Sequence, residues 1–119
     1  MLRFHFVTLK KEIMLNLPTI FKNKALAIEQ LCIENKVRKL YLFGSALKPN
    51  FSKKSDIDLI VEIEEDNPIL KGEILMKTWS ELELIFKRKV DLLTSKNVKN
   101  PILKKSIEEN IQLIYDRNN

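Results

Sequence analysis

Hydrophobic positions along the chain follow two spacings in turn, and each change of spacing marks an expected element. Between residues 17 and 35, apolar side chains recur at three- and four-residue intervals, the spacing of one helix face. Asn16 suits the N-cap of this helix and Pro18 its first turn. Its stripe consists of Ile20, Ala27, Ile28 and Leu31. Residues 38–43 then form a short apolar run that predicts a buried strand, and Gly44 ends it.

The second expected strand follows a polar connection over residues 46–55. From residue 56 to residue 63, apolar and polar positions alternate, as they do in a strand with one buried face. The apolar face consists of Ile57, Leu59, Val61 and Ile63. The opposite face is mostly polar and consists of Asp56, Asp58, Ile60 and Glu62.

A second long helix and a third strand follow. Asn67 suits an N-cap and Pro68 a first helical position, so we expect a helix from there to about Lys87. Its apolar face consists of Ile74, Leu75, Met76, Trp79, Leu82, Ile85 and Phe86. The sequence VDLLT at residues 90–94 predicts a third strand.

Asn100 and Pro101 repeat this capping pattern and open a last helix, with an apolar stripe of Leu103, Ile107, Ile111 and Ile114. A chain of 119 residues is expected to form one domain. The short connection between the first two strands favours an antiparallel pair, and the helical crossover favours a parallel third strand. The pattern predicts an α+β fold, a small mixed sheet with helices packed on one side.

Chemistry-bearing residues gather at the ends of these strands. Gly44 and Ser45 form a turn that can offer N–H groups and a hydroxyl to a phosphate. Asp56 and Asp58 lie on one strand face about 7 Å apart, where two carboxylates can share a hard cation such as Mg²⁺. Asp91 lies in an apolar strand, where a carboxylate is costly unless it is paired or binds a cation. If the third strand lies beside the second, three carboxylates converge and can clamp two metal ions about 3.5–4 Å apart.

This pattern resembles a known family. Gly44-Ser45, ten intervening residues, Asp56 and Asp58 one residue apart, and the later Asp91 are similar to the motif of the DNA polymerase β nucleotidyltransferase superfamily. The short chain is typical of its minimal nucleotidyltransferase (MNT) members. The resemblance covers about residues 20 to 115, and the matching fold is a DNA polymerase β-like nucleotidyltransferase fold.

The resemblance implies a role for each motif residue. Gly44 and Ser45 would hold the triphosphate of ATP, and Asp56, Asp58 and Asp91 would bind two Mg²⁺ ions. The reaction would transfer NMP to an acceptor hydroxyl and release pyrophosphate. The implied partner is a HEPN-type toxin, with the MNT protein as the antitoxin that adds AMP to it.

The loop after Ser45 departs from the family pattern. Relatives often have Ala-Arg-Gly there, whereas Lys48 and Pro49 stand at the last two positions of this chain's loop. Lysine keeps the positive charge but loses the bidentate fork of arginine. Lys48 and Ser55 are candidate nucleotide-binding residues; the plainer interpretations are a solvated loop lysine and a serine that supports the turn.

Two other functions stay open from the sequence. The altered loop favours a binding module that neutralises a partner by complex formation, with a weak or inactive nucleotide site. A transferase that acts on a small molecule or on RNA would need an acceptor-binding domain, for which 119 residues leave no room. Exposed helix faces could pair with the HEPN partner or with a second copy of the chain.

Composition narrows the setting. The net charge is +5 with a pI near 9.3, but the lysines are scattered, so direct binding of nucleic acid is not expected. A single cysteine, Cys32, excludes an internal disulfide and fits the cytoplasm. No apolar run reaches the length of a membrane span. Met14 is a candidate start, which would make residues 1–13 an N-terminal extension of a domain over residues 14–119.

Overall fold

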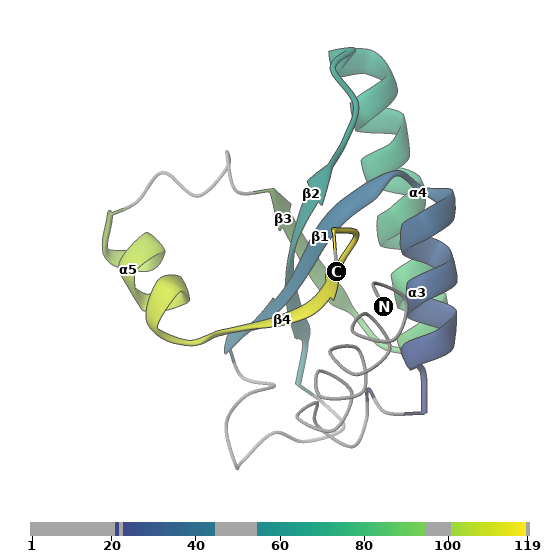
Figure 1. Ribbon diagram of the computed structural model, residues 1–119. Coiled ribbons are helices and arrows are strands. Elements are labelled where there is room, and N and C mark those ends of the chain that lie inside the picture. Colours follow the sequence, from purple (N-terminus) through teal and green to yellow (C-terminus); the bar gives the residue numbers. More distant parts are fainter. Residues whose placement is uncertain (1–20, 22, 45–54, 95–100, 119) are drawn as a thin grey trace, which may run out of the picture.

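Four strands form one sheet in the order β3-β2-β1-β4 (Figure 1). The computed structural model describes residues 21, 23–44, 55–94 and 101–118. Its elements, in chain order, are α3 (Ala25–Glu34), β1 (Val37–Phe43), β2 (Ile57–Ile63), α4 (Pro68–Phe86), β3 (Val90–Thr94), α5 (Pro101–Glu109) and β4 (Ile111–Asp116).

The strand pairing follows the expected connections. β1 pairs antiparallel with β2 and also with β4, while β2 pairs parallel with β3. The short link between β1 and β2 allows the antiparallel pair, and the crossover through α4 gives the parallel one. The predicted mixed sheet of an α+β fold is therefore confirmed.

α4 begins and ends as its sequence indicates. The Asn67 side chain accepts hydrogen bonds from the backbone N–H groups of Ile69 and Leu70, and Pro68 occupies the first helical position. The helix ends at Phe86, after which Lys87 adopts the left-handed conformation with φ 53°. Phe86 is buried, but Met76, expected on the apolar face, is 60% exposed.

β4 corrects the prediction for the C-terminal segment. α5 ends at Glu109, and Ile111 and Ile114, expected to continue its stripe, lie in a strand that pairs with β1. The spacing of these four apolar residues fits one long helix, but it also fits a shorter helix followed by a strand, because isoleucine also favours strands. The free edge of β1 supplies the ladder of hydrogen bonds that makes this segment a strand.

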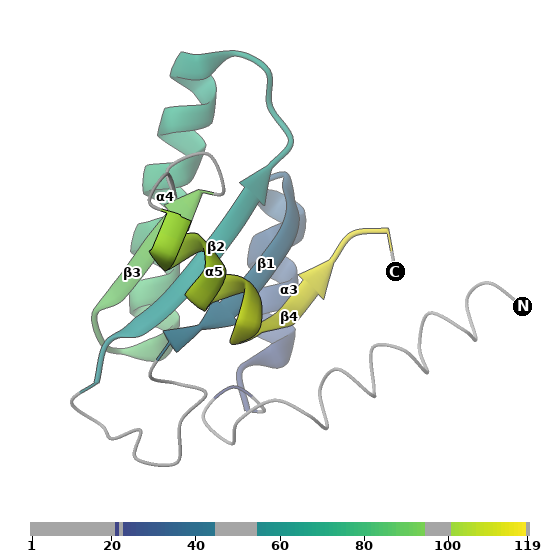
Figure 2. The ribbon, with the colours of Figure 1, turned by 90° about the vertical axis from the view of Figure 1, so that its left-hand side faces the viewer.

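α3 lies beside α4 on one face of the sheet, and α5 lies across the opposite face (Figures 1 and 2). The main core lies between the sheet and the α3–α4 pair and includes Leu40, Leu59 and Leu92. Ile60 points to the other face of β2 and is nevertheless buried at 5% exposure. The hydrophobic pattern predicted helices on one side of the sheet and did not indicate α5 on the other.

The helix expected over residues 17–35 is described from Ala25 to Glu34. Ile28 and Leu31 are buried as expected, whereas Ala27 is exposed. Asn16, Pro18 and Ile20 lie outside the described residues, as does Met14. In the described parts of the chain, no helix combines the length and the apolar character that a membrane crossing requires.

Candidate nucleotidyl-transfer site

One row of residues crosses all four strands at the end where β1 stops and β2 and β3 begin. In register, Ile111 of β4 pairs with Phe43 of β1, Phe43 with Asp58 of β2, and Asp58 with Asp91 of β3. Paired residues on neighbouring strands point to the same face of a sheet. The row therefore places two carboxylates side by side, with two apolar side chains next to them.

This row faces away from the main core. Leu59 and Leu92, the next residues along β2 and β3, belong to the core under α3 and α4, so Asp58 and Asp91 point to the opposite face. Both aspartates are half-buried. Each of these two residues is thus partly exposed, which a site for a charged ligand requires.

Gly44 touches the row at Asp58. Its φ is 75°, a value that L side chains rarely adopt, and a Cβ added there would lie 2.4 Å from Asp58 Oδ2. The glycine therefore lets the backbone pass directly against this carboxylate. The turn that the sequence predicted is also a close approach to a candidate metal ligand.

Asp56 lies just before β2 and is partly exposed to solvent. Its side chain is 44% exposed, and Lys89 Nζ lies 3.8 Å from its Oδ2. An exposed pair at that distance contributes little to stability. The Asp56 side chain is therefore partly open to solvent beside Lys89.

The segment after α4 braces this stretch of backbone. Arg88 Nη1 donates a hydrogen bond of 3.0 Å to the carbonyl oxygen of Ser55, and the Ile57 N–H donates to the carbonyl oxygen of Lys89 at 3.1 Å. Arg88 was not singled out from the sequence, because no local motif connects it to Ser55, 33 positions away. The Ser55 carbonyl is thus bonded to the segment after α4, and a nucleotide-binding role for Ser55 stays a prediction.

Two side chains of α4 hold the residue next to Asp91. Trp79 Nε1 donates to the carbonyl oxygen of Val90 at 2.7 Å, and Glu83 Oε2 accepts from the Val90 N–H at 3.0 Å. The sequence assigned Trp79 to the core, and its ring does pack against the core cluster. Its N–H has a second function that helical periodicity did not reveal.

The donor set fits a hard cation in its chemistry. Carboxylate oxygens are the ligands that Mg²⁺ prefers, and the register brings Asp58 and Asp91 together. Within the described ranges, no three His, Cys, Asp or Glu side chains gather closely enough to hold a metal ion. Joint ligation by Asp56, Asp58 and Asp91 therefore stays a prediction. Ser45 and Lys48 lie outside the described residues.

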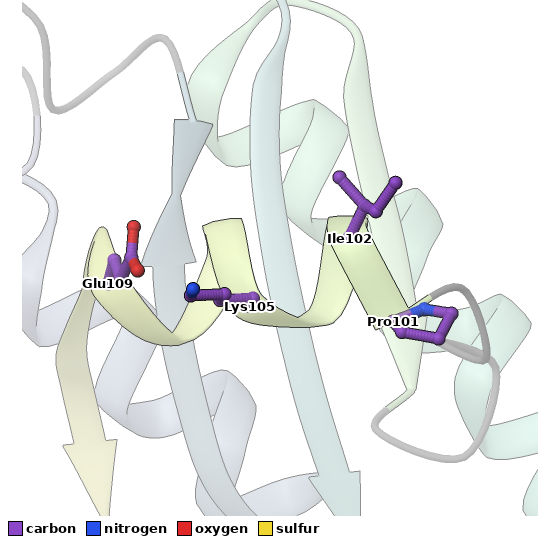
Figure 3. A pocket seen from close by; sticks show the side chains of 4 residues that line it. All are labelled: Pro101, Ile102, Lys105 and Glu109. Atoms are coloured by element: carbon purple, nitrogen blue, oxygen red, sulfur yellow. The ribbon is translucent and has the colours of Figure 1, made fainter.

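A separate hollow lies on α5 (Figure 3). It has a volume of about 590 Å³, and its described lining residues are Pro101, Ile102, Lys105 and Glu109. None of these is among the residues predicted from the sequence for nucleotide or metal binding. Ile102 is 82% exposed, so the hollow opens to the surface.

The family model "Polymerase beta, Nucleotidyltransferase" matches residues 27–119, a range that includes the Gly44 turn and the row of aspartates. A protein of Methanocaldococcus jannaschii, assigned by inference as a protein adenylyltransferase, is 45% identical over 80 residues. That match covers 67% of this chain and 77% of the relative. The likeness to this relative therefore extends over most of both chains.

Solved structures share the fold. One, described as tri-AMPylated HEPN toxin of Shewanella oneidensis in complex with MNT antitoxin, gives a TM-score of 0.51 at 22% identity, covering 82% of this chain and 73% of that chain. Another, a toxin–antitoxin complex with AMP-PNP, gives a TM-score of 0.56 at 23% identity, covering 77% of this chain and 73% of that chain. At these identities the likeness concerns the fold.

Proposed function

Because the chain belongs to the polymerase β nucleotidyltransferase family, we propose that it transfers AMP from ATP to a hydroxyl group of a partner protein, with Mg²⁺ as cofactor. Family membership makes the chain an enzyme of the nucleotidyltransferase type. The observation that carries the proposal is the placement of Asp58 beside Asp91, with the Gly44 backbone against Asp58.

The choice of AMP and of a protein acceptor draws support from the relatives. The protein that is 45% identical is assigned as a protein adenylyltransferase, and a neighbour in fold is a complex with AMP-PNP. A protein as the source of the acceptor hydroxyl agrees with the assignment of this relative.

Different residues of the chain are proposed to bind the metal, the acceptor proton and the phosphates during the reaction. The acceptor oxygen attacks the α-phosphorus, the bond from that phosphorus to the β-phosphate oxygen breaks, and pyrophosphate leaves. Asp56, Asp58 and Asp91 would hold Mg²⁺, which when bound neutralises charge on the triphosphate and favours the deprotonated acceptor. Asp91 is proposed to help draw the proton from the acceptor hydroxyl. Gly44, Ser45 and Lys48 are proposed to face the phosphates.

We also propose an antitoxin role with a HEPN-type toxin as the acceptor. The support is a fold neighbour that is an MNT antitoxin in complex with an AMPylated HEPN toxin. AMP on a toxin residue would add charge and bulk there, which can block a functional surface. A cytoplasmic setting, expected from the single cysteine, is part of this proposal.

The test is label transfer from α-labelled ATP to a purified HEPN-type toxin in the presence of Mg²⁺. The wild type is compared with Asp58→Asn and with Asp66→Asn, an exposed aspartate outside the row. We expect labelled toxin with the wild type and with Asp66→Asn, and a loss of at least about a hundredfold with Asp58→Asn, since a metal ligand is removed.

The same reaction separates the proposal from a plain binding module. Toxin that is bound and neutralised equally by wild type and by Asp58→Asn, with no label in either, would show that the fold acts through complex formation. Label on the toxin with equal intensity in all three proteins would show that Asp58 does not take part in the chemistry.

A further inference from the structure

Val90, the first residue of β3, has its backbone N–H and C=O on the side of the strand that faces away from β2. β3 is an edge strand, and Val90 pairs with Ile57 of β2. The Ile57 N–H bonds to the carbonyl of Lys89, the residue before Val90. Because successive residues of a strand direct their backbone groups to opposite sides, the N–H and C=O of Val90 point away from β2.

Both of these backbone groups form hydrogen bonds with side chains of α4. Trp79 Nε1–H donates to the Val90 oxygen at 2.7 Å, and Glu83 Oε2 accepts from the Val90 nitrogen at 3.0 Å. Trp79 and Glu83 are four residues apart, so they lie on one face of the helix. Val90 is 0% exposed, so water could not replace either partner without opening the structure.

The connection between α4 and β3 is short and fixed at both ends. The Lys87 N–H donates to the backbone oxygen of Glu83 at 2.8 Å, while the Glu83 carboxylate holds Val90. Glu83 therefore joins the end of the helix to the start of the strand. Asp91 is the next residue after Val90, so this attachment lies one residue away from the side chain that pairs with Asp58.

We propose that Trp79 and Glu83 are positioning residues for nucleotidyl transfer, which by holding the backbone of Val90 set Asp91 beside Asp58. The inference rests on the proposed function, because the contacts to Val90 can affect metal binding only if Asp91 is a metal ligand. Neither side chain contacts the reacting groups, and each acts through Val90. An edge strand is protected from pairing with other chains by a covering segment or by charged side chains. Here a single residue, Val90, instead forms two hydrogen bonds with side chains of α4.

The test uses Mn²⁺ as the probe, with affinity measured by electron paramagnetic resonance without nucleotide, and hydrogen exchange at the Val90 amide. The variants are Glu83→Ala, Glu83→Gln, which keeps an acceptor oxygen, and Asp91→Asn as the reference for a lost ligand. Glu73→Ala is the matched control, an exposed glutamate of the same helix.

We expect Glu83→Ala to speed exchange at Val90 and to weaken Mn²⁺ binding by about tenfold, the usual size for groups that orient metal ligands. Glu83→Gln should regain most of the Mn²⁺ affinity, and Glu73→Ala should match the wild type. Trp79→Phe keeps an aromatic ring but loses the N–H, and should weaken Mn²⁺ binding in the same direction. It keeps the proposal testable if Glu83→Ala does not fold.

Two results would count against positioning in different ways. Wild-type Mn²⁺ affinity in folded Glu83→Ala and Trp79→Phe, with Asp91→Asn clearly weaker, would overturn the positioning role and leave the proposed function standing. Equal Mn²⁺ affinity in the wild type and Asp91→Asn would remove Asp91 from the metal site, and the proposed function would then need revision together with this inference.

Discussion

Gly44 is the residue whose role in the site is most strictly set by geometry. Its φ is positive, and a Cβ at this position would lie only 2.4 Å from Asp58 Oδ2, so a side chain there would displace this carboxylate. The sequence predicted the turn from Gly44 and Ser45 at the end of an apolar run. The contact with Asp58 arises from the register of β1 on β2, which no local pattern specifies.

Gly44→Ala should therefore lower both stability and transfer. The left-handed backbone costs alanine about 1–2 kcal/mol, and the displaced Asp58 carboxylate adds to that loss. Gly72→Ala is the matched control, since nothing lies within 4 Å of a Cβ there and the residue is inside α4. Urea unfolding should show the control more stable than wild type by about 0.5–1 kcal/mol. Equal stability of Gly44→Ala and wild type would contradict the observed close approach.

Cys32 gives a prediction for the dependence of stability on pH. Burial raises the pKa of its thiol from 9.0 to about 12, and Glu29 adds to the rise. The unfolded chain therefore ionises first, and the stabilisation present below pH 9 is lost as the pH rises towards 12. Relative to Cys32→Ala, the wild type should lose about 1.4 kcal/mol of unfolding free energy per pH unit above 9. Parallel pH profiles of the two proteins in urea unfolding would contradict this.

At the scale of elements, the boundaries of α4 were readable because its caps are local. Asn67 accepts from two N–H groups of the first turn, and Pro68 needs no donor there. β4 was not readable, because Ile111 and Ile114 continue a helical spacing and only the edge of β1 decides otherwise. Local chemistry thus predicts where an element starts, while pairing with a distant strand decides what the next segment becomes.

Asn67→Ala should weaken α4 at its start. Removing the cap costs about 1 kcal/mol, since the N–H groups of Ile69 and Leu70 lose their shared acceptor. Asn67→Asp keeps the acceptor oxygen and should stay within a few tenths of a kcal/mol of wild type. Thermal unfolding of the three proteins checks the order, and equal midpoints for Asn67→Ala and wild type would exclude the cap as a source of stability.

Ile114→Ala tests the burial of β4. Ile114 is 9% exposed and belongs to the core cluster, so its truncation should cost about 2–4 kcal/mol. Ile102→Ala removes the same groups from a site on α5 that is 82% exposed, and should change the unfolding free energy by less than about 0.5 kcal/mol. A similar small effect of both substitutions would show that β4 does not pack as described.

At the scale of the whole molecule, the sequence predicted the strands of the sheet and the site residues better than it predicted which helix covers which face of the sheet. The hydrophobic pattern predicted three strands, and Asp91 was expected near Asp58 if the third strand lies beside the second. The register shows that these strands are neighbours and pairs Asp58 with Asp91. Burial of Ile60, on the face expected to be mostly polar, was not predicted, and this is the face of the sheet across which α5 lies (Figure 2). Periodicity records that a face is apolar or polar, and not which later segment covers it.

The proposed function makes one chemical claim, that AMP passes from ATP to a protein hydroxyl at the Asp58–Asp91 row. The most direct measurement compares α-labelled with γ-labelled ATP in parallel reactions with a HEPN-type toxin and Mg²⁺. We predict toxin labelled from the α position alone, with one pyrophosphate released for each AMP attached. Toxin labelled from the γ position would show phosphoryl rather than nucleotidyl transfer, and would contradict the claim.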